Sequence, residues 1–354
     1  MNNKDDRQLN LETWATESLA ALGKTQVNSL TVETVNDDAS FRRYFRAHLG
    51  TQSYILVDAP PEHENSASFF AIAKLLKENG INVPAVYSAD FDQGYMLLSD
   101  LGDDLYIDLL QLDASGARVG SLYADAFAVL VELSKIPAPA VPAYSSTKLI
   151  EEMRLFRDWF VEKQLQIQLS PSENQMLEGL FELLVASAEQ QPQVFVHRDY
   201  HCRNLMVATS NNPGVIDFQD AVIGPITYDL VSLLKDCYWR FPREQVRGWV
   251  ESHRVALGLA VDGPTFMRWF DFMGMQRHLK CAGIFCRLNL RDGKSGYLDD
   301  IPLVFDYLLE VSDSYQELAF FGDWLRQSIQ PRLNLLVRQR QHIDGLSDNE
   351  GSLA

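Results

Sequence analysis

One short stretch of the chain brings together the residue types needed for proton transfer and metal binding. His197, Arg198 and Asp199 are consecutive, and Asn204 follows five residues after the aspartate. This spacing fits H-R-D-x-x-x-x-N, the pattern of a catalytic loop for phosphoryl transfer. In such a loop the carboxylate faces the attacking hydroxyl, and the amide reaches a metal ion on the phosphate side. The stretch therefore predicts Asp199 as a catalytic base and Asn204 as a ligand of Mg²⁺.

A second acidic residue follows at the end of a predicted hairpin. Two short apolar runs, Leu205–Val207 and Gly214–Ile216, are separated by polar residues, and the second leads directly into Asp217. An Asp-Phe pair in this place is typical of the second metal ligand in phosphoryl-transfer enzymes, although Gln219 stands where a glycine is usual. We predict that Asp217 binds the metal. Gln219 and Asp220 then lie near the transferred phosphate, and we predict that they contribute to substrate binding.

The two histidines of the loop leave a second interpretation open. His197 and His201 are four residues apart, which is the spacing of two metal ligands on one face of a helix. A zinc-dependent hydrolase, which would not use ATP, is the class that this interpretation suggests. The preceding residues, Val194–Val196, are apolar and favour a strand instead. The sequence therefore favours the phosphoryl-transfer loop, with His197 supporting it through a hydrogen bond.

The first hundred residues predict a small antiparallel sheet with two helices. Short alternating segments bounded by polar stretches are typical of strands, and apolar residues spaced three and four apart are typical of helices. Asn10 is a candidate N-cap for the first helix. The expected order is a helix at 11–22, strands at 29–35, 41–48 and 53–57, a helix at 66–79, and strands at 83–87 and 95–98.

Helical periodicity dominates the rest of the chain. The pattern predicts helices at 116–134, 147–166 and 172–188 and from 226 to about 330, with a strand–loop–strand unit at 193–217. We therefore expect an α+β protein with a small sheet-rich N-terminal lobe, residues 1–100, and a larger helical C-terminal lobe, residues 101–338. The polar residues 339–354 are expected to form a flexible tail.

The composition argues against several classes of protein. The chain has 354 residues, of which 46% are hydrophobic, so it can bury a sizeable core. Its formal net charge of −17 argues against nucleic acid or an anionic membrane surface as the main partner. Neither a signal-peptide pattern nor a run of about 18 apolar residues is present. The four cysteines form no C-x-x-C pair, which favours reduced thiols in the cytoplasm.

The loop and hairpin resemble those of the aminoglycoside phosphotransferase and choline kinase superfamily. That resemblance implies a bilobal, protein-kinase-like fold, with ATP as the phosphoryl donor and Mg²⁺ as the cofactor. A closer resemblance is to bacterial kinases that phosphorylate the anomeric hydroxyl of the amino sugars N-acetylmuramate and N-acetylglucosamine in peptidoglycan recycling. It spans roughly residues 35–310 and is carried by DASFRRYFR (38–46), VDAPP (57–61), LLSDLG (97–102), HRDYHCRN (197–204), IDFQDA (216–221), GPITYDL (224–230), QRHLK (276–280) and RDGK (291–294).

The resemblance also implies where ATP would bind. The segment from Ser99 to Leu101 would form the hinge whose backbone meets the adenine. The phosphate loop would be residues 36–40, but it contains no glycine. Its backbone N–H groups and the Ser40 hydroxyl would then hold a phosphate.

A second departure concerns the cation that the nucleotide phosphates require. The third strand, 53–57, lacks the lysine that this superfamily places there. Arg43 and Arg46, on the preceding strand, are the candidate replacements because a cation is needed near the α- and β-phosphates. Glu64 is a candidate for orienting one of these two arginines.

A basic cluster in the helical lobe is a candidate site for the acceptor. Arg277, His278 and Lys280 lie on one predicted helix of an otherwise acidic chain. They form either a solvated helix face or a receptor for the lactyl carboxylate of N-acetylmuramate. Charged and aromatic residues at 152–159 are a further candidate, and Asp229 is interpreted mainly as a helix cap or loop anchor.

Other acceptors and a second class of function stay open. An aminoglycoside would need a pocket lined with carboxylates, which the basic cluster opposes if it faces the site. Choline would need an aromatic cage, for which Tyr238, Trp239 and Trp269 are candidates. The missing strand lysine also suggests a catalytically weak nucleotide-binding module of the same fold. The sequence indicates no oligomeric state.

Overall fold

The antiparallel sheet predicted for the first hundred residues is present in the computed structural model, which describes residues 5–37, 41–112, 118–138 and 140–350. The chain divides into two compact units. Unit 1 is Met1–Ala138 with Arg203–Ala221, and unit 2 is Pro139–Cys202 with Val222–Ala354. The boundary predicted near residue 100 coincides with none of the three changes of unit, because two helices beyond it lie in the same unit as the sheet.

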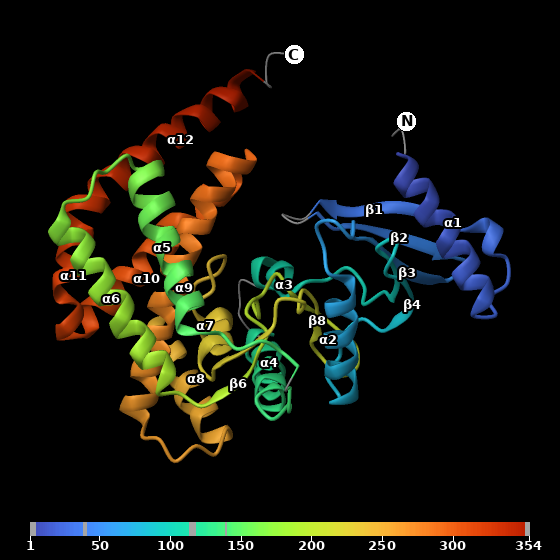
Figure 1. The fold of residues 1–354 in the computed structure, drawn as a ribbon, viewed down its shortest axis with the longest axis horizontal. Coiled ribbons are helices and arrows are strands. Elements are labelled where there is room, and N and C mark those ends of the chain that lie inside the picture. Colours follow the sequence, from blue (N-terminus) through green and yellow to red (C-terminus); the bar gives the residue numbers. More distant parts are fainter. Residues whose placement is uncertain (1–4, 38–40, 113–117, 139, 351–354) are drawn as a thin grey trace. The chain divides into compact units, whose positions relative to one another are not determined.

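Five strands form the sheet of unit 1 in the order β1-β2-β3-β5-β4, and each is antiparallel to its neighbours (Figure 1). Strand β4 starts three residues later than the expected 83, since Pro84 has no N–H to donate to a ladder. The elements of this unit up to residue 138 are α1 (Asp6–Ala21), β1 (Thr31–Asp37), β2 (Arg43–Leu49), β3 (Gln52–Asp58), α2 (Ser66–Glu78), β4 (Val86–Asp90), β5 (Tyr95–Ser99), α3 (Tyr106–Leu112) and α4 (Val119–Leu133).

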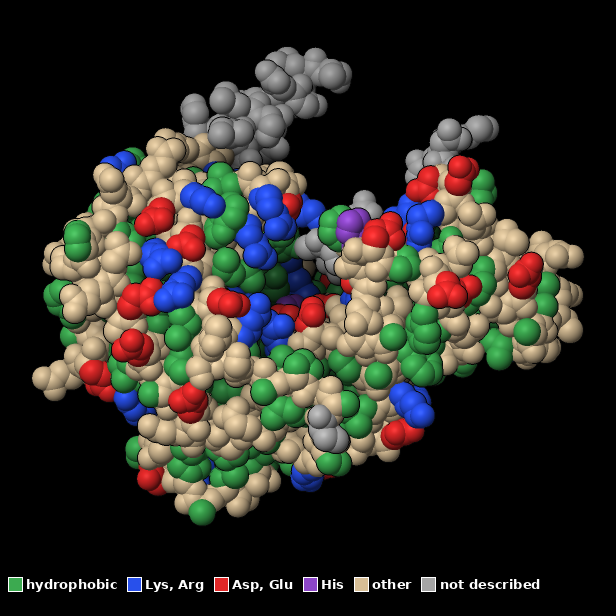
Figure 2. Space-filling model, in the orientation of Figure 1, with side chains coloured by type: hydrophobic (Ala, Val, Ile, Leu, Met, Phe, Trp, Pro, Cys, Tyr) green, Lys and Arg blue, Asp and Glu red, His purple; other side chains and the backbone are tan. Residues whose placement is uncertain are grey.

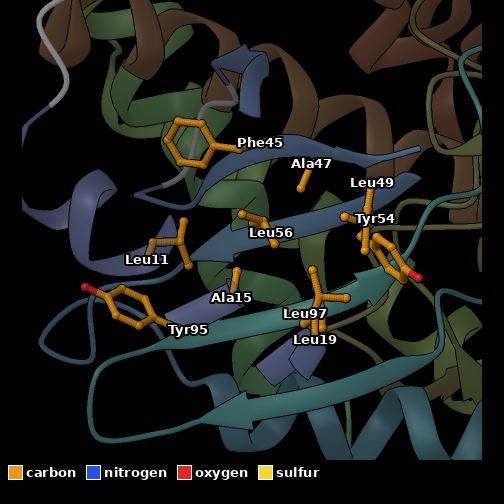
Figure 3. Close-up of a cluster of buried hydrophobic side chains, with 10 residues drawn as sticks. All are labelled: Leu11, Ala15, Leu19, Phe45, Ala47, Leu49, Tyr54, Leu56, Tyr95 and Leu97. Carbon is orange, nitrogen blue, oxygen red and sulfur yellow. The ribbon is translucent and has the colours of Figure 1, made fainter. Parts of the chain in front are cut away.

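Helix α1 packs across one face of this sheet and makes the core of unit 1 (Figure 3). Leu11, Ala15 and Leu19 are spaced four residues apart, so they lie on one side of the helix. They pack against alternate residues of the strands, including Phe45 and Leu56. Because side chains on a strand alternate between its two faces, this packing also decides on which face each charged residue of β2 and β3 lies.

Helix α1 begins five residues earlier than the sequence analysis predicted. Its N-cap is Asp5, whose carboxylate accepts a hydrogen bond from the backbone N–H of Gln8 at 2.8 Å. Asn10, the predicted cap, lies inside the helix. An aspartate at this position satisfies a backbone donor that the helix itself leaves without a partner.

The hairpin that follows the catalytic loop also belongs to unit 1. Strands β7 (Leu205–Met206) and β8 (Gly214–Val215) pair antiparallel, as predicted. The Val215 N–H donates to the carbonyl of Asn82 at 2.7 Å. Gly214 lies so close to the Leu101 side chain that a Cβ would approach it to 2.9 Å. The hairpin is therefore fixed beside the segment that follows β5.

Helix α9 (Gly263–Asp292) is the centre of unit 2, and α5, η2, α6, α7, α8 and α10 pack against it (Figure 1). Its buried residues lie on all sides, as expected for a helix surrounded by others. The remaining elements of unit 2 are α5 (Ser146–Leu155), η2 (Phe156–Gln164), α6 (Pro171–Glu189), β6 (Gln193–Val196), β9 (Val222–Pro225), α7 (Tyr228–Leu234), α8 (Arg243–Ala256), η3 (Ser295–Asp300), α10 (Ile301–Ser314), η4 (Gln316–Leu318), α11 (Ala319–Trp324), η5 (Leu325–Ile329) and α12 (Gln330–Glu350).

Two helical segments differ from the prediction. The single helix expected at 147–166 is α5 followed by the π-helical segment η2. Helix α12 continues through most of the expected flexible tail, and Arg340 forms an ion pair of 2.9 Å with Asp299. In the part of the chain that the structure describes, no helix has both the length and the apolar character needed to span a membrane.

The close contact between α9 and the end of α5 leads to a stability prediction. A Cβ at Gly283 would lie 2.3 Å from the carbonyl carbon of Leu155, so Gly283→Ala forces the two helices apart. We expect a loss of roughly 1–3 kcal/mol in the free energy of unfolding. The control is Gly274→Ala on the same helix, where the nearest atom, on Val231, is 3.6 Å away. This variant should gain about 0.5–1 kcal/mol from helix propensity.

Urea denaturation of the full chain measures both free energies. Equal changes for the two variants, or a more stable Gly283→Ala, would show that the helices do not approach as closely as described.

Candidate active site

Two buried aspartates hold the catalytic loop in unit 2. The carboxylate of Asp229, in the first turn of α7, accepts the backbone N–H groups of His197 at 2.6 Å and Arg198 at 2.9 Å. Asp236 accepts the N–H of Cys202 at 3.1 Å. Arg198 has a φ of 79°, which is unfavourable for a residue with a side chain. Asp229 is thus a loop anchor, and burial raises the pKa of its carboxyl to about 7 although the two backbone donors act in the opposite direction.

Asp199, the predicted base, lies among positive charges. Burial disfavours ionisation of its carboxyl, but the charges of Lys280, His201, Arg277 and Arg198 outweigh this effect and lower its pKa to about 2. The carboxyl of Asp199 is therefore ionised at neutral pH. A pKa lowered in spite of burial also means that the electrostatic potential at this carboxyl is positive.

A buried carboxylate, Glu152 of α5, balances these cations. Arg198 donates from Nη2 to Glu152 at 2.5 Å, and the Lys280 ammonium lies 3.7 Å from the other carboxylate oxygen. The Tyr144 hydroxyl also donates to Glu152, and Lys280 donates to the Tyr228 hydroxyl at 3.2 Å. A buried charge of this kind is tolerated only when it is paired and hydrogen-bonded.

The structure separates the three residues of the predicted basic cluster. Arg277 and Lys280 are both buried and act on Asp199, so they do not form a solvated helix face. The Arg277 guanidinium donates to the sulfur of Cys237 at 3.4 Å. His278 points elsewhere: its Nε2–H donates to the carbonyl of Lys235 at 2.8 Å.

His278 also carries no charge at neutral pH. Burial, together with the nearby Arg277, lowers the pKa of its ring to about 3, and the ring stacks on Tyr307 with 4.7 Å between centroids. Adjacent residues on a helix point about 100° apart, which the sequence analysis did not take into account. The expectation that His278 joins Arg277 and Lys280 in one cationic group is wrong.

The candidate metal ligands lie together in unit 1. The Asn204 amide donates to a carboxylate oxygen of Asp217 at 3.2 Å, and the Ile216 N–H donates to the Asn204 carbonyl at 3.1 Å. Gln219 donates from its amide to the second oxygen of Asp217 at 2.6 Å. Asp217 has a φ of 64°, in the left-handed region that is unfavourable for a residue with a side chain.

These residues fit a magnesium ion. Mg²⁺ prefers oxygen ligands and is usually held by one or two carboxylates together with substrate phosphates. Asp217 would supply the carboxylate and Asn204 the oxygen of the amide whose nitrogen donates to Asp217. Gln219 adds a buried side-chain oxygen that has no hydrogen-bond partner among the described residues. Asp220 is exposed to solvent.

The predicted nucleotide residues of unit 1 fall into different environments. Ser40 lies outside the described residues. Ser99 exchanges hydrogen bonds with Ala85, whose N–H donates to the Ser99 hydroxyl at 2.8 Å and whose carbonyl accepts the Ser99 N–H at 2.8 Å. Leu101 packs against Gly214, three residues before Asp217. The hinge segment and the metal ligands are therefore connected through one hairpin.

The two candidate arginines lie on opposite faces of the sheet. Arg43 is on the α1 face, over the ring of Phe45, and its guanidinium pairs with Asp58 at 2.6 Å. Arg46 is on the other face and pairs with Asp100 of the hinge segment at 2.7 Å. Arg43 is therefore held as part of the packing of α1, whereas Arg46 lies on the opposite face, beside the hinge segment.

Glu64 pairs with a different arginine from the one expected. Its carboxylate lies 2.9 Å from the guanidinium of Arg42, a residue that the sequence analysis did not single out. Arg42 is buried and lies over the ring of Phe69, which in turn contacts Phe218, next to Asp217. The expectation that Glu64 orients Arg43 or Arg46 is wrong.

The segment from His197 to His201 is not helical. The spacing of these two histidines therefore does not place them on one helical face, which the zinc interpretation requires. The His197 ring nitrogen Nδ1 accepts the backbone N–H of Asp199 at 3.3 Å. His201 packs edge-on against Tyr238.

Comparison with known proteins identifies the family. The sequence pattern of the phosphotransferase enzyme family matches residues 31–270, more than half of the chain. The chain belongs to this family. It is 38% identical over 339 residues to the N-acetylmuramate/N-acetylglucosamine kinase of Pseudomonas putida, covering 92% of this chain and 98% of that one. It is 41% identical over 289 residues to the enzyme of the same name from Neisseria meningitidis serogroup B, covering 80% and 86%.

The fold of this phosphotransferase is shared with solved structures. Choline kinase LicA from Streptococcus pneumoniae is 13% identical, and the likeness covers 86% of this chain and 100% of that chain with a TM-score of 0.59. The kinase-like α+β fold that the resemblance implied is confirmed.

Sequence reasoning noted Glu152 only as one polar residue of a helix. Its position carried a signal, because Leu149, Met153 and Phe156 form an apolar stripe on which Glu152 also falls. A charge on the buried face of a helix needs a partner of opposite charge. Lys280, which the sequence analysis had named for another role, is one such partner. Arg42 carried no such signal, because its partner Glu64 is distant in sequence.

A magnesium titration tests the metal ligands of this phosphotransferase. Asp217→Ala removes a charged ligand, so the Mg²⁺ concentration for half-maximal rate should rise by at least the roughly 10- to 100-fold that loss of a supporting residue costs. Asn204→Ala removes a neutral ligand and should have a smaller effect. Asp92→Ala, an exposed carboxylate of the same unit, is the control. Unchanged titrations for both ligand variants would remove Asn204 and Asp217 from this role.

Proposed function

We propose that this phosphotransferase moves the γ-phosphoryl group of ATP to the anomeric hydroxyl of N-acetylmuramate and of N-acetylglucosamine, giving the sugar 1-phosphate. The relatives that carry these sugars in their names, at 38% and 41% identity, support the choice of acceptor. The charge around Asp199 supports it independently. We place the reaction in the cytoplasm, as a step in the recycling of cell-wall sugars.

Asp199 is the catalytic residue of this proposal. An ionised carboxylate accepts a hydrogen bond from the sugar hydroxyl, orients it, and takes its proton as the new O–P bond forms and the bond from the γ-phosphorus to the departing ADP oxygen breaks. With a pKa of about 2, Asp199 is a weak base. An anomeric hydroxyl is more acidic than other sugar hydroxyls, so a weak base that is always ionised suits it.

Asn204 and Asp217 hold the magnesium ion in this proposal. When bound, Mg²⁺ neutralises charge on the β- and γ-phosphates of ATP. Ser99 and Leu101 contribute the backbone of the adenine hinge, and Ser40 contributes a phosphate contact. Gln219 and Asp220, which follow the metal ligand, bind the substrate.

For the phosphate cation we favour Arg46 over Arg43. Arg46 lies on the sheet face opposite α1 and is attached to the hinge segment through Asp100. Each arginine is engaged by two carboxylates, Arg43 by Asp5 and Asp58 and Arg46 by Asp100 and Asp103, so the preference rests on the link to the hinge. The presence of a cation beside the hinge also argues for an active enzyme over a weak nucleotide-binding module.

The positive potential at Asp199 separates the candidate acceptors. Lys280 and Arg277 lower the pKa of this carboxyl, so their charges oppose the attraction that ionised Asp199 would otherwise exert on a cationic acceptor. Choline and the aminoglycosides are cations. N-acetylglucosamine is neutral and N-acetylmuramate is an anion, so both are compatible with this field. On the face of unit 2 that Figure 2 shows, acidic and basic side chains are both present, so this face gives no comparable selection.

A panel of acceptors tests the proposal. The full chain is incubated with ATP, Mg²⁺ and either N-acetylmuramate, N-acetylglucosamine, choline or an aminoglycoside, and ADP release is followed. We expect turnover of the two amino sugars and a phosphorus NMR doublet, because one proton is bonded to the anomeric carbon. The control is Asp199→Asn, which should lose about 10²–10⁴ in rate while ATP affinity changes by less than about tenfold.

A phosphorus triplet would place the phosphate on the 6-hydroxyl and contradict the anomeric assignment. Turnover of choline or of the aminoglycoside alone would contradict the choice of acceptor.

A further inference from the structure

Helix α9 follows α5 and η2 over several turns. One face of α9 carries three of these contacts: Gln276 lies 3.5 Å from the Tyr144 hydroxyl, Lys280 pairs with Glu152, and Gly283 touches the backbone of Leu155. Further along, Asn289, on a different side of α9, donates to the side chain of Gln164 at 3.1 Å. The contacts advance together along both segments, so α9 runs parallel to them.

Arg287 continues this face of α9. It lies four residues after Gly283 and seven after Lys280, spacings that place all three on one side of the helix. Seven residues correspond to roughly 10 Å along the axis. Arg287 therefore projects from the same side as Lys280, between the contact with Leu155 and the contact with Gln164.

Arg287 differs from the other buried cations of unit 2 in having no partner. Its side chain is half-buried and its Nε atom is fully buried, yet it forms no hydrogen bond or ion pair with the side chains that the structure describes, those of residues 5–35, 41–112, 118–138 and 140–341. Lys280 pairs with Glu152, Arg198 pairs with the same carboxylate, and Arg277 contacts Cys237. Even exposed Arg291, one turn further on, pairs with Asp292.

The surroundings of Arg287 make a charged guanidinium without a partner unfavourable. Burial lowers the pKa of its guanidinium, and the like charge of Arg291 acts in the same direction. Asp292 and Glu152 oppose these effects only through space. A half-buried guanidinium without a partner costs free energy that an incoming anion recovers. The stabilisation is largest for a carboxylate, which a guanidinium binds through two parallel hydrogen bonds.

We propose that Arg287 binds the carboxylate of an acidic amino sugar whose anomeric hydroxyl lies at Asp199. The inference rests on the proposed function and names the residue that distinguishes N-acetylmuramate from N-acetylglucosamine. Arg277 and Lys280, which the sequence suggested for this role, are buried and engaged by Cys237 and Glu152. Arg287, on the same helix face, is partly exposed and has no carboxylate partner within the described residues.

Kinetics with the two sugars test this assignment. Arg287→Gln should lower kcat/KM for N-acetylmuramate by roughly 10- to 100-fold, the loss expected for a charge-assisted pair, mainly through KM. N-acetylglucosamine has no carboxylate, so its kcat/KM should change by less than about twofold. Arg287→Lys keeps the charge without the paired donors, so its kcat/KM for N-acetylmuramate should lie between those of the wild type and Arg287→Gln. The matched control is Arg291→Gln, which removes an exposed arginine of the same helix and should leave both sugars unaffected.

The melting temperature separates recognition from a structural role. Arg287→Gln removes a half-buried charge without a partner, so its melting temperature should equal or exceed that of the wild type. A lower melting temperature with equal losses for both sugars would overturn the assignment, as would unchanged kinetics for N-acetylmuramate. If the wild type turns over neither sugar, the proposed function fails and the assignment fails with it.

Discussion

The burial of Glu152 between α5 and α9 is the constraint on which the rest of unit 2 depends. This carboxylate pairs with Arg198 of the catalytic loop and with Lys280 of α9, and it accepts a hydrogen bond from Tyr144. Removing one member of such a buried set leaves a charge without compensation, which costs roughly 3–5 kcal/mol. Helix packing, the conformation of the loop and the charge at Asp199 are therefore coupled through one side chain.

The same set of charges links the packing to the proposed chemistry. Glu152 keeps Lys280 and Arg198 close to Asp199, where their field holds the base ionised and disfavours a cationic acceptor. Asp229 fixes the loop by accepting two consecutive backbone N–H groups. Beyond this balanced region the same face of α9 presents Arg287, for which no partner exists among the described residues. In this account, acceptor selection follows from two facts: Glu152 pairs with Lys280 and Arg198, and Arg287 is left without a partner among the described residues.

The sequence predicted features that depend on local order along the chain. The strands, the hairpin before Asp217 and the loop containing Asp199 follow from alternation and spacing, which are local. The partners of charged residues depend on distant elements and were not predictable. Glu64 pairs with Arg42, and Arg43 lies on the face covered by α1, because of how the sheet and helices pack. The expected grouping of His278 with Lys280 ignored the direction in which neighbouring helical residues point.

The pKa of Asp199 tests the central claim most directly. In protein carrying ¹³C-labelled aspartate carboxyls, with Asp199→Asn used for assignment, the signal can be followed from pH 8 down to pH 3. The pKa of Asp199 is lowered from the ordinary value of 3.8 to about 2. The stability that this ionised group contributes to the folded state is therefore fully present above pH 3.8 and is lost only as the pH falls towards 2. We expect no titration of Asp199 in this range, and a midpoint that rises into it in Lys280→Gln. A wild-type midpoint at or above 3.8, or one that does not respond to Lys280→Gln, would contradict the account.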